Sequence, residues 1–132
     1  MHAFIVECLN KPGELARVTE AVAAKGINLT ASSTLAWGEK GAIGFLTNDE
    51  PGTRTALEQA GLAHREVEVV SFDLPDRPGT LADASRRLAT VGVNIEFLVP
   101  TGMSAGRITF AAAVDNVPAA QQALGDLLKV HA

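Results

Sequence analysis

The chain has 132 residues, a formal net charge of −4 and no basic run longer than Arg86-Arg87. Direct binding to nucleic acid is therefore not expected, because contacts to phosphates need clustered lysine and arginine side chains. The hydrophobic share of 47% and the low aromatic content are typical of an ordinary globular protein. The one cysteine, Cys8, excludes an intramolecular disulfide and argues against a thiolate metal site.

The start of the sequence indicates a cytoplasmic protein. Residues 1–7 lack the basic beginning and the long apolar run of a secretory signal peptide. No segment approaches the roughly 18 uninterrupted apolar residues that a membrane-spanning helix needs, so no membrane partner is expected.

Taken in order, the first half of the chain predicts alternating strands and helices. Residues 3–9 form a short run with valine and isoleucine, which predicts a strand that is buried on at least one face. From Gly13, apolar residues recur at helical spacing until Lys25-Gly26, which predicts an amphipathic helix. Two strands, a helix and a further strand are then expected at 27–37, 42–48, 50–60 and 64–70.

The second half repeats this order, with a helix at 79–91, strands at 93–100 and 107–114, and a helix at 117–129. Residues 130–132 are too few for a complete closing strand. At the joint between the halves, the alternation of apolar and polar residues changes phase between Val69 and Val70. Because such a slip moves side chains to the opposite face, we expect one long strand here, or two strands joined by a bulge.

Two stretches of the chain match each other at a fixed offset. Residues 10–16 read NKPGELA and residues 76–82 read DRPGTLA, so Pro12 and Pro78 are 66 positions apart. The same offset aligns GINL at 26–29 with GVNI at 92–95, without a gap. Each first stretch predicts a strand end, a proline turn and a glycine that opens a helix. The free amides of that helix N-terminus could bind a small anion.

This repeated pattern resembles the ACT domain, a ferredoxin-like module that binds amino acids and similar small effectors. The resemblance covers nearly the whole chain and divides it into two ACT-like domains, residues 1–69 and 70–132. It implies an α+β fold with two tandem copies of the ferredoxin-like βαββαβ sandwich, packed together.

The resemblance also implies which residues hold an effector. In ACT domains, the polar residue that precedes the Pro-Gly motif and the asparagine of the second motif contribute to binding. Carried over to this sequence, the expected ligand-binding residues are Asn10, Pro12, Gly13, Glu14, Leu15, Asn28 and Leu29 in the first copy, and Asp76, Pro78, Gly79, Thr80, Leu81, Asn94 and Ile95 in the second.

The two motif asparagines have an alternative role. The side chains of Asn28 and Asn94 could instead bond neighbouring backbone groups and only shape the turn. Some amino-acid-binding ACT domains also carry a histidine two residues before the motif, where this sequence has Cys8 and Leu74. Trp37 could contact a ligand or act as a packing anchor between the copies.

A catalytic function is not expected. The sequence has no nucleophile elbow, phosphate-binding loop or zinc-protease motif, and His2, His64 and His131 are expected to be solvated surface residues. We therefore expect a sensor that binds an amino acid, needs no cofactor or metal and is not an enzyme. The alternative is a regulatory subunit that acts through assembly with an enzyme of amino-acid metabolism.

The second copy lacks a complete fourth strand, so one edge of its sheet should be uncovered. Unpaired edges promote association. We therefore expect the long joint strand or a second chain to cover this edge, and the protein to be a homodimer.

Overall fold

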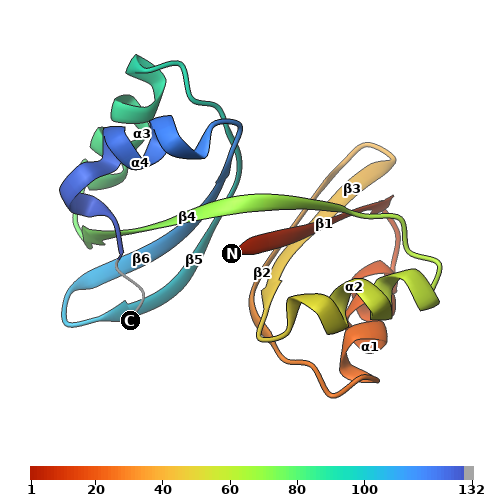
Figure 1. Ribbon diagram of the computed structural model, residues 1–132. Helices are drawn as coiled ribbons and strands as arrows, with labels where there is room; N and C mark the ends of the chain where they lie inside the picture. Colours follow the sequence, from red (N-terminus) through yellow and green to blue (C-terminus); the bar gives the residue numbers. More distant parts are fainter. Residues whose placement is uncertain (130–132) are drawn as a thin grey trace. The chain divides into compact units, whose positions relative to one another are not determined.

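The computed structural model describes residues 1–129, which form four α-helices and six strands (Figure 1). The expectation about residues 130–132 lies outside the described residues. None of the helices over residues 1–129 is long and apolar enough to span a membrane. In chain order the elements are β1 (His2–Leu9), α1 (Glu14–Ala23), β2 (Leu29–Trp37), β3 (Lys40–Thr47), α2 (Glu50–Gln59), β4 (Arg65–Pro75), α3 (Thr80–Thr90), β5 (Ile95–Ser104), β6 (Arg107–Val114), α4 (Val117–Leu124) and the 3-10 helix η1 (Gly125–Leu127).

The chain forms two compact units. The N-terminal unit is His2–Val67, and the C-terminal unit comprises the residues from Glu68 onward together with Met1. The boundary falls within β4, which is a single strand of 11 residues. The prediction of one long strand at the joint is therefore confirmed. Beyond the change of phase, Val70, Phe72 and Leu74 are buried in the core of the C-terminal unit.

In the N-terminal unit the strands are antiparallel in the order β2-β3-β1, and α1 and α2 pack on the same core. The register places Phe4 opposite Phe45, and their rings stack with centroids 5.8 Å apart. Helix α1 contributes Val18 and Val22, which are four residues apart and so lie on one face. The buried residues of this core are Phe4, Val6, Val18, Val22, Ile27, Ile43, Phe45, Leu57 and Leu62.

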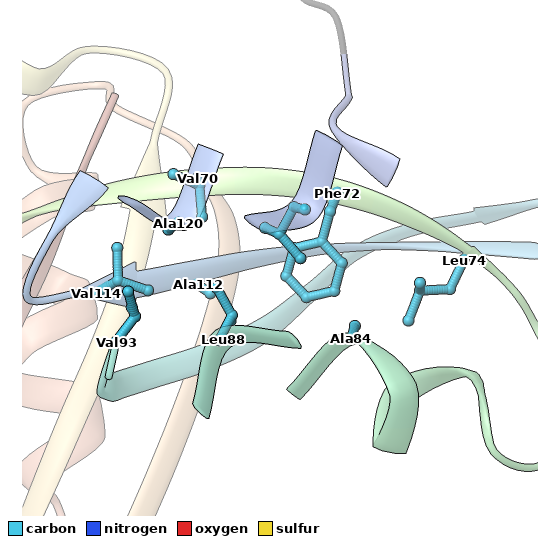
Figure 2. Packing of buried hydrophobic residues seen from close by; sticks show 10 residues of the cluster. Val70, Phe72, Leu74, Ala84, Leu88, Val93, Ala112, Val114 and Ala120 are labelled. Atoms are coloured by element: carbon cyan, nitrogen blue, oxygen red, sulfur yellow. The ribbon is translucent and has the colours of Figure 1, made fainter. Parts of the chain in front are cut away.

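The C-terminal unit has the same plan, with antiparallel strands in the order β4-β6-β5. Phe72 stacks on Phe110 at a centroid distance of 5.8 Å. Helix α3 contributes Ala84 and Leu88 to the core, and α4 contributes Ala120 (Figure 2). The described residues thus confirm the α+β class with antiparallel strands and four helices.

Two element boundaries differ from the predictions by four residues or more. Helix α4 ends at Leu124, five residues earlier than expected, because Gly125 adopts a positive φ of 48°. Strand β5 continues to Ser104 instead of stopping at Pro100, since the turn needs only Ala105 and Gly106. Both turn residues have positive φ, as a two-residue hairpin turn requires.

The edge of β4 is partly covered by its own unit, which corrects the expectation of an open edge. After η1, Leu128 forms an isolated antiparallel bridge with Phe72, and the amide of Lys129 donates to the carbonyl of Ser71 at 2.8 Å. The carbonyl of Met1 accepts a hydrogen bond from the amide of Val69 at 3.0 Å. The expected homodimer stays a prediction.

Candidate functional site

The two Pro-Gly turns have the same backbone geometry. Gly13 and Gly79 precede α1 and α3 with φ of 91° and 92°, a left-handed conformation that favours glycine. In both cases no side chain caps the helix N-terminus. The first amides of α1 and α3 are therefore not bonded by a capping side chain, unlike those of α2 and α4.

A cavity of about 950 Å³ lies beside the first turn, and we call it the N-terminal cavity. The end of β1, the start of α1 and the hairpin between β2 and β3 form its walls. An adjoining pocket of about 200 Å³ extends between α1 and the sheet, and shares Cys8, Gly13 and Gly41 with the cavity. The residues that line the N-terminal cavity are Glu7, Cys8, Leu9, Lys11, Pro12, Gly13, Glu14, Arg17, Trp37, Lys40, Gly41 and Ala42.

Small residues form the floor of this region. Cys8, Gly41 and Ala36 are direct neighbours across β1, β3 and β2, so their side-chain positions share one face. A Cβ atom at Gly41 would lie 3.2 Å from the Cβ of Ala36 and 3.3 Å from the Sγ of Cys8. This row is therefore close-packed at Gly41, and an added side chain there would press against both neighbours.

Glu14 is the most constrained charged group at the site. It is only 7% exposed, and its carboxylate accepts hydrogen bonds from Nη2 and Nε of Arg17 at 2.7 and 3.1 Å. Nζ of Lys11 lies 3.7 Å from the same carboxylate. The hydrogen bond from Arg17 holds the pKa of Glu14 below its usual value of 4.5. The carboxylate is therefore charged at neutral pH, and its charge is balanced by Arg17.

A smaller cavity of about 450 Å³ lies beside the second turn, and we call it the C-terminal cavity. Thr80 occupies the position of Glu14, and its hydroxyl donates to the carbonyls of Pro75 at 2.8 Å and Arg77 at 3.1 Å. No ion pair corresponding to that of Glu14 and Arg17 can form there, because Asp83 stands at the position of Arg17. The lining residues are Leu74, Pro75, Arg77, Pro78, Gly79, Thr80, Asp83 and Leu127.

The structure brings some of the expected ligand-binding residues together. Pro12, Gly13 and Glu14 line the N-terminal cavity, and Asn10 and Leu15 line the adjoining pocket. In the C-terminal unit, Pro78, Gly79 and Thr80 line the cavity, whereas Asp76 and Leu81 are not among its lining residues.

Asn10 and Asp76 have a clear structural role. The amide of Asn10 donates to the carbonyl of Glu39 at 2.9 Å, and its Nδ2 donates to the carbonyl of Gly38 at 3.0 Å. The amide of Asp76 donates in the same way to Gly106, at 2.8 Å. Both residues therefore tie the Pro-Gly turn to a β-hairpin.

Asn28, Leu29, Asn94 and Ile95 line none of the three cavities described above. Asn28 precedes β2, whereas the cavity lies at the other end of this strand, where Trp37 is. At about 3.3 Å per residue the two ends are roughly 26 Å apart. Within one unit, the two halves of the motif therefore do not converge, and an effector contact by these residues stays a prediction.

The main-chain amides of the two motif asparagines donate hydrogen bonds to nearby side chains. The amide of Asn28 donates to Oδ1 of Asn48 at 3.2 Å, and the amide of Asn94 donates to Oδ1 of Asp115 at 2.9 Å. The side chains of Asn28 and Asn94 are exposed. The bonds thus fix the start of β2 and β5 through the main chain.

Sequence reasoning did not identify several residues of the cavity wall. Arg17 follows Glu14 by three residues, which is the spacing of a helical ion pair and could have indicated it. Lys40 and Gly41 reach the cavity only through the register of the β2–β3 hairpin, which the local sequence does not give. Trp37, for which a ligand contact is one of two expected roles, is 71% exposed and lines the cavity.

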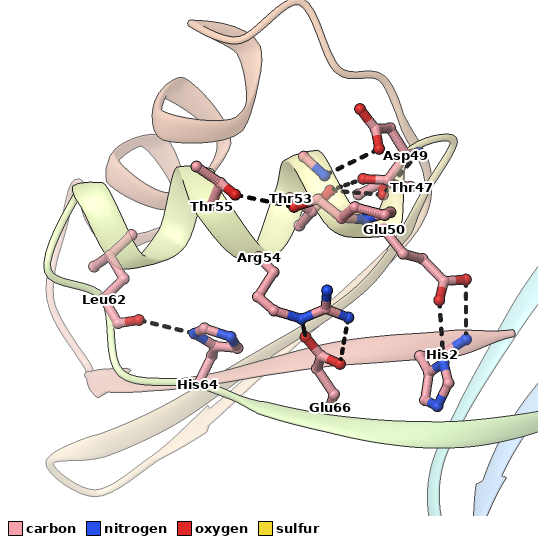
Figure 3. Close-up of polar contacts among 12 residues, drawn as sticks. His2, Thr47, Asp49, Glu50, Thr53, Arg54, Thr55, Leu62, His64 and Glu66 are labelled. Carbon is pink, nitrogen blue, oxygen red and sulfur yellow. Dashed lines mark hydrogen bonds and ion pairs between the residues drawn. The ribbon is translucent and has the colours of Figure 1, made fainter.

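Two of the three histidines lie within hydrogen-bond distance of partners in the described part of the chain. His2 and His64 are half-buried and bonded, which corrects the expectation of solvated side chains: Nδ1 of His2 lies 3.1 Å from Oε1 of Glu50, and Nδ1 of His64 lies 3.1 Å from the carbonyl of Leu62 (Figure 3). His131 lies outside the described residues. The same part of the chain has no group of three His, Cys, Asp or Glu side chains placed to hold a metal.

An ion pair lies next to these histidines. Nη2 of Arg54 donates to Oε2 of Glu66 at 2.9 Å, and Nε donates to the other carboxylate oxygen (Figure 3). This hydrogen bonding holds the pKa of Glu66 below its usual range. The pair ties α2 to the start of β4 within the N-terminal unit.

No protein-family model and no curated protein matches the sequence. Among solved structures, protein BT0572 from Bacteroides thetaiotaomicron is similar with a TM-score of 0.81 and 24% identity, over 97% of this chain and 90% of that chain. The ligand-free regulatory subunit of aspartate kinase from Thermus thermophilus has a TM-score of 0.66 and 22% identity, over 97% and 93% of the two chains. The regulatory subunit of aspartate kinase from Thermus flavus has a TM-score of 0.65 and 22% identity, over 95% and 91%. At these identities, the likeness shows a shared fold.

Proposed function

We propose that this chain is a regulatory protein that binds an amino acid beside its Pro-Gly turns and has no catalytic activity of its own. The observation that carries the proposal is the N-terminal cavity, which lies against the repeated motif and has a volume of about 950 Å³. Ligand-binding pockets commonly have about 300–1,000 Å³. Two of the structural neighbours are described as regulatory subunits of aspartate kinase, which supports a regulatory function.

In this proposal each half of the chain is one ACT-like module with the ferredoxin-like βαββαβ plan, residues 1–69 and 70–132. The carboxylate of the amino acid would accept hydrogen bonds from amides of the first helical turn, near Gly13 and Glu14 in one module or Gly79 and Thr80 in the other. The helix dipole favours an anion at this position. The expected effect is a shift between two states of the protein, for which a coupling free energy of about 1–3 kcal/mol is typical.

A thermal-shift screen of the twenty amino acids tests this function directly. An amino acid present at 100 times its dissociation constant should add about 2.7 kcal/mol to the stability of the folded state. For a protein of this size that corresponds to a rise of several degrees in the melting temperature. If no amino acid raises the melting temperature, the proposed sensor function is wrong.

A second candidate function is assembly, as a homodimer or as the subunit of a cytoplasmic enzyme. The supporting observation is a group of exposed apolar side chains on the N-terminal unit: Leu9 is 56% exposed, Leu35 is 64% exposed and Trp37 is 71% exposed. All three lie at or beside the cavity. Light scattering at high micromolar concentration distinguishes a monomer from a dimer. Co-purification of an enzyme of amino-acid metabolism would favour this function over the sensor.

A further inference from the structure

We infer that the two Pro-Gly sites are not equivalent, and that the chain binds one acidic amino acid, in the N-terminal cavity, with Gly41, Cys8 and Lys40 as the residues that determine this selectivity. The inference rests on the proposed function and extends it in two respects. It names which of the two sites is occupied, and it names the charge class of the amino acid.

The space above the sheet differs between the two units. In the N-terminal unit the row of cross-strand neighbours nearest the turn is Cys8, Gly41 and Ala36. In the C-terminal unit the corresponding row is Leu74, Ile108 and Met103. Every small residue of the first row thus has a large apolar counterpart in the second row.

In the C-terminal unit, Leu74 and Ile108 fill the space that Cys8 and Gly41 leave empty in the N-terminal unit. Leu74 is only 2% exposed and belongs to the hydrophobic core, with Ile108 packed against it. Cys8 is half-buried and lines both the N-terminal cavity and the adjoining pocket. The cavity volumes follow the same order, about 950 Å³ beside the first turn and about 450 Å³ beside the second. Of the cavities described, the one beside the first turn extends over residues of β1, β2 and β3, whereas the one beside the second turn reaches only Leu74 and Pro75 of the sheet.

The wall of the N-terminal cavity is charged. Three cationic and two anionic side chains line the N-terminal cavity, so its wall carries one positive charge in excess. Glu14 is already bonded by Arg17 and lies 3.7 Å from Nζ of Lys11, whereas Lys40 and Glu7 form no ion pair within residues 1–129. Lys40 is thus the free cation of this wall. Its ammonium group can pair with a ligand carboxylate, which favours a ligand that carries a second carboxylate.

The C-terminal cavity lacks this excess of charge. Its charged lining residues are Arg77 and Asp83, which balance each other. Asp83 also lies 3.5 Å from Nε of Arg87 on the same helix, so Arg77 is a cation of this wall without an ion pair within residues 1–129. A ligand carboxylate can therefore pair with Arg77 as well as with Lys40, and the smaller volume of the C-terminal cavity is what favours the first site.

The fluorescence of Trp37 can report binding in the N-terminal cavity. It is the single tryptophan of the chain, and it lies opposite Lys40 in the β2–β3 register, with Leu9 on the other side of Lys40. Directly opposed residues of neighbouring strands have adjacent side chains. Binding next to Lys40 should therefore change the fluorescence of Trp37, whereas binding in the C-terminal unit alone should leave it unaltered.

The test is a titration of the intact protein with L-glutamate and with its neutral counterpart L-glutamine, followed by Trp37 fluorescence and by calorimetry. We expect one L-glutamate per chain, a fluorescence change with the same midpoint, and binding of L-glutamine that is about fivefold weaker. Lys40→Gln should remove this preference. Arg77→Gln, at the other cavity, should leave both midpoints unchanged.

Two variants examine the floor of the cavity. Gly41→Ala and Cys8→Leu should each weaken L-glutamate binding by tenfold or more, since both add atoms where the recess lies. The matched control is Gly102→Ala in β5, where an added Cβ would meet no atom within 4 Å. Cys8→Leu changes a half-buried residue, so it remains informative if the close contacts at Gly41 prevent that variant from folding. Melting temperatures of all variants exclude unfolding as the cause.

Several results would overturn the inference. They are two L-glutamate molecules per chain, loss of binding in Arg77→Gln, equal affinity for L-glutamine, unchanged binding in folded Cys8→Leu, or no binding of either probe. These results leave the proposed function standing if another amino acid raises the melting temperature in the thermal-shift screen. Failure of that whole screen, by contrast, removes the proposed function itself.

Discussion

The two Pro-Gly turns have nearly the same backbone but different surroundings. Gly13 and Gly79 differ by one degree in φ, and each turn is tied to a hairpin by an equivalent amide. The first turn nevertheless borders a cavity with five charged lining residues and a glycine in its floor, whereas the second borders a smaller cavity with only Arg77 and Asp83 as charged lining residues. The motif therefore fixes the path of the chain, and residues outside the motif decide whether a ligand has room.

The capping of the helix N-termini is also repeated in the two units. Helices α2 and α4 both begin after a side-chain cap, with Asp49 accepting from the amide of Gly52 at 3.0 Å and Asn116 from that of Ala119 at 3.1 Å. Helices α1 and α3 begin after an uncapped glycine. In each unit, the helix next to the proposed site is thus the one with the less satisfied N-terminus.

The largest expected effect tests whether the two cores are equivalent. Phe45→Ala and Phe72→Ala each remove a fully buried ring, and each should lower the free energy of unfolding by about 3–5 kcal/mol. Denaturant unfolding measures this loss. The exposed Met103 offers a control, since Met103→Ala should change the free energy of unfolding by no more than about 0.5 kcal/mol. Costs that differ by more than a factor of two would show that the cores are not matched.

An intermediate effect is expected at the helix caps. Asp49→Ala and Asn116→Ala each leave first-turn amides without their acceptor, which should lower the free energy of unfolding by about 1 kcal/mol. Asp49→Asn retains an acceptor oxygen and should restore most of the loss. Unfolding curves of the three variants check this, and an alanine variant as stable as the wild type would contradict it.

The motif asparagines can be separated from their structural partners. Asp115→Ala removes the acceptor of the Asn94 amide and should cost about 0.5–1.5 kcal/mol of stability. Asn94→Ala keeps that amide and changes an exposed side chain, so its unfolding free energy should stay within about 0.5 kcal/mol of the wild type.

The same pair of variants addresses ligand binding. If Asn94 contacts an effector, Asn94→Ala should abolish the ligand-induced rise in melting temperature without changing the melting temperature of the free protein. Strong destabilisation by Asn94→Ala would instead favour the purely structural role of this residue.

The smallest expected effect concerns pH and distinguishes Glu14 from Thr80. Because bonding to Arg17 lowers the folded-state pKa of Glu14, this carboxylate stabilises the protein fully above its unfolded pKa of about 4.5. That contribution is lost as the pH falls through the lower folded-state pKa. Glu14→Gln should therefore lose less stability than the wild type between about pH 6 and pH 3. Unfolding midpoints at both pH values measure the difference, and Glu20→Gln, which changes an exposed carboxylate on the same helix, is the control.

Much of the fold could be predicted because periodicity and turn residues are local signals. The helix that was predicted too long, α4, has apolar residues at helical spacing on both sides of Gly125, so only the backbone shows the break. The strand that was predicted too short, β5, contains Pro100 and Gly102, which commonly end strands. It tolerates them because it is an edge strand with a register shift between these two residues.

The candidate site could be predicted only in part, for a related reason. The Pro-Gly turn is encoded within seven consecutive residues, so the sequence alone locates it. Lys40 and Gly41 join the site through strand pairing across β1, β3 and β2. Such register is a long-range property, and no local pattern around these two residues indicates it.

The short segment after α4 has a consequence for synthesis on the ribosome. The backbone groups of Ser71 and Phe72 on the edge of β4 meet Leu128 and Lys129, which are translated more than fifty residues later. At about 5–20 residues per second, this edge stays without its partner for several seconds in every newly made chain. During that interval it can pair with a neighbouring nascent chain, so slower translation of the last helix should increase aggregation during expression.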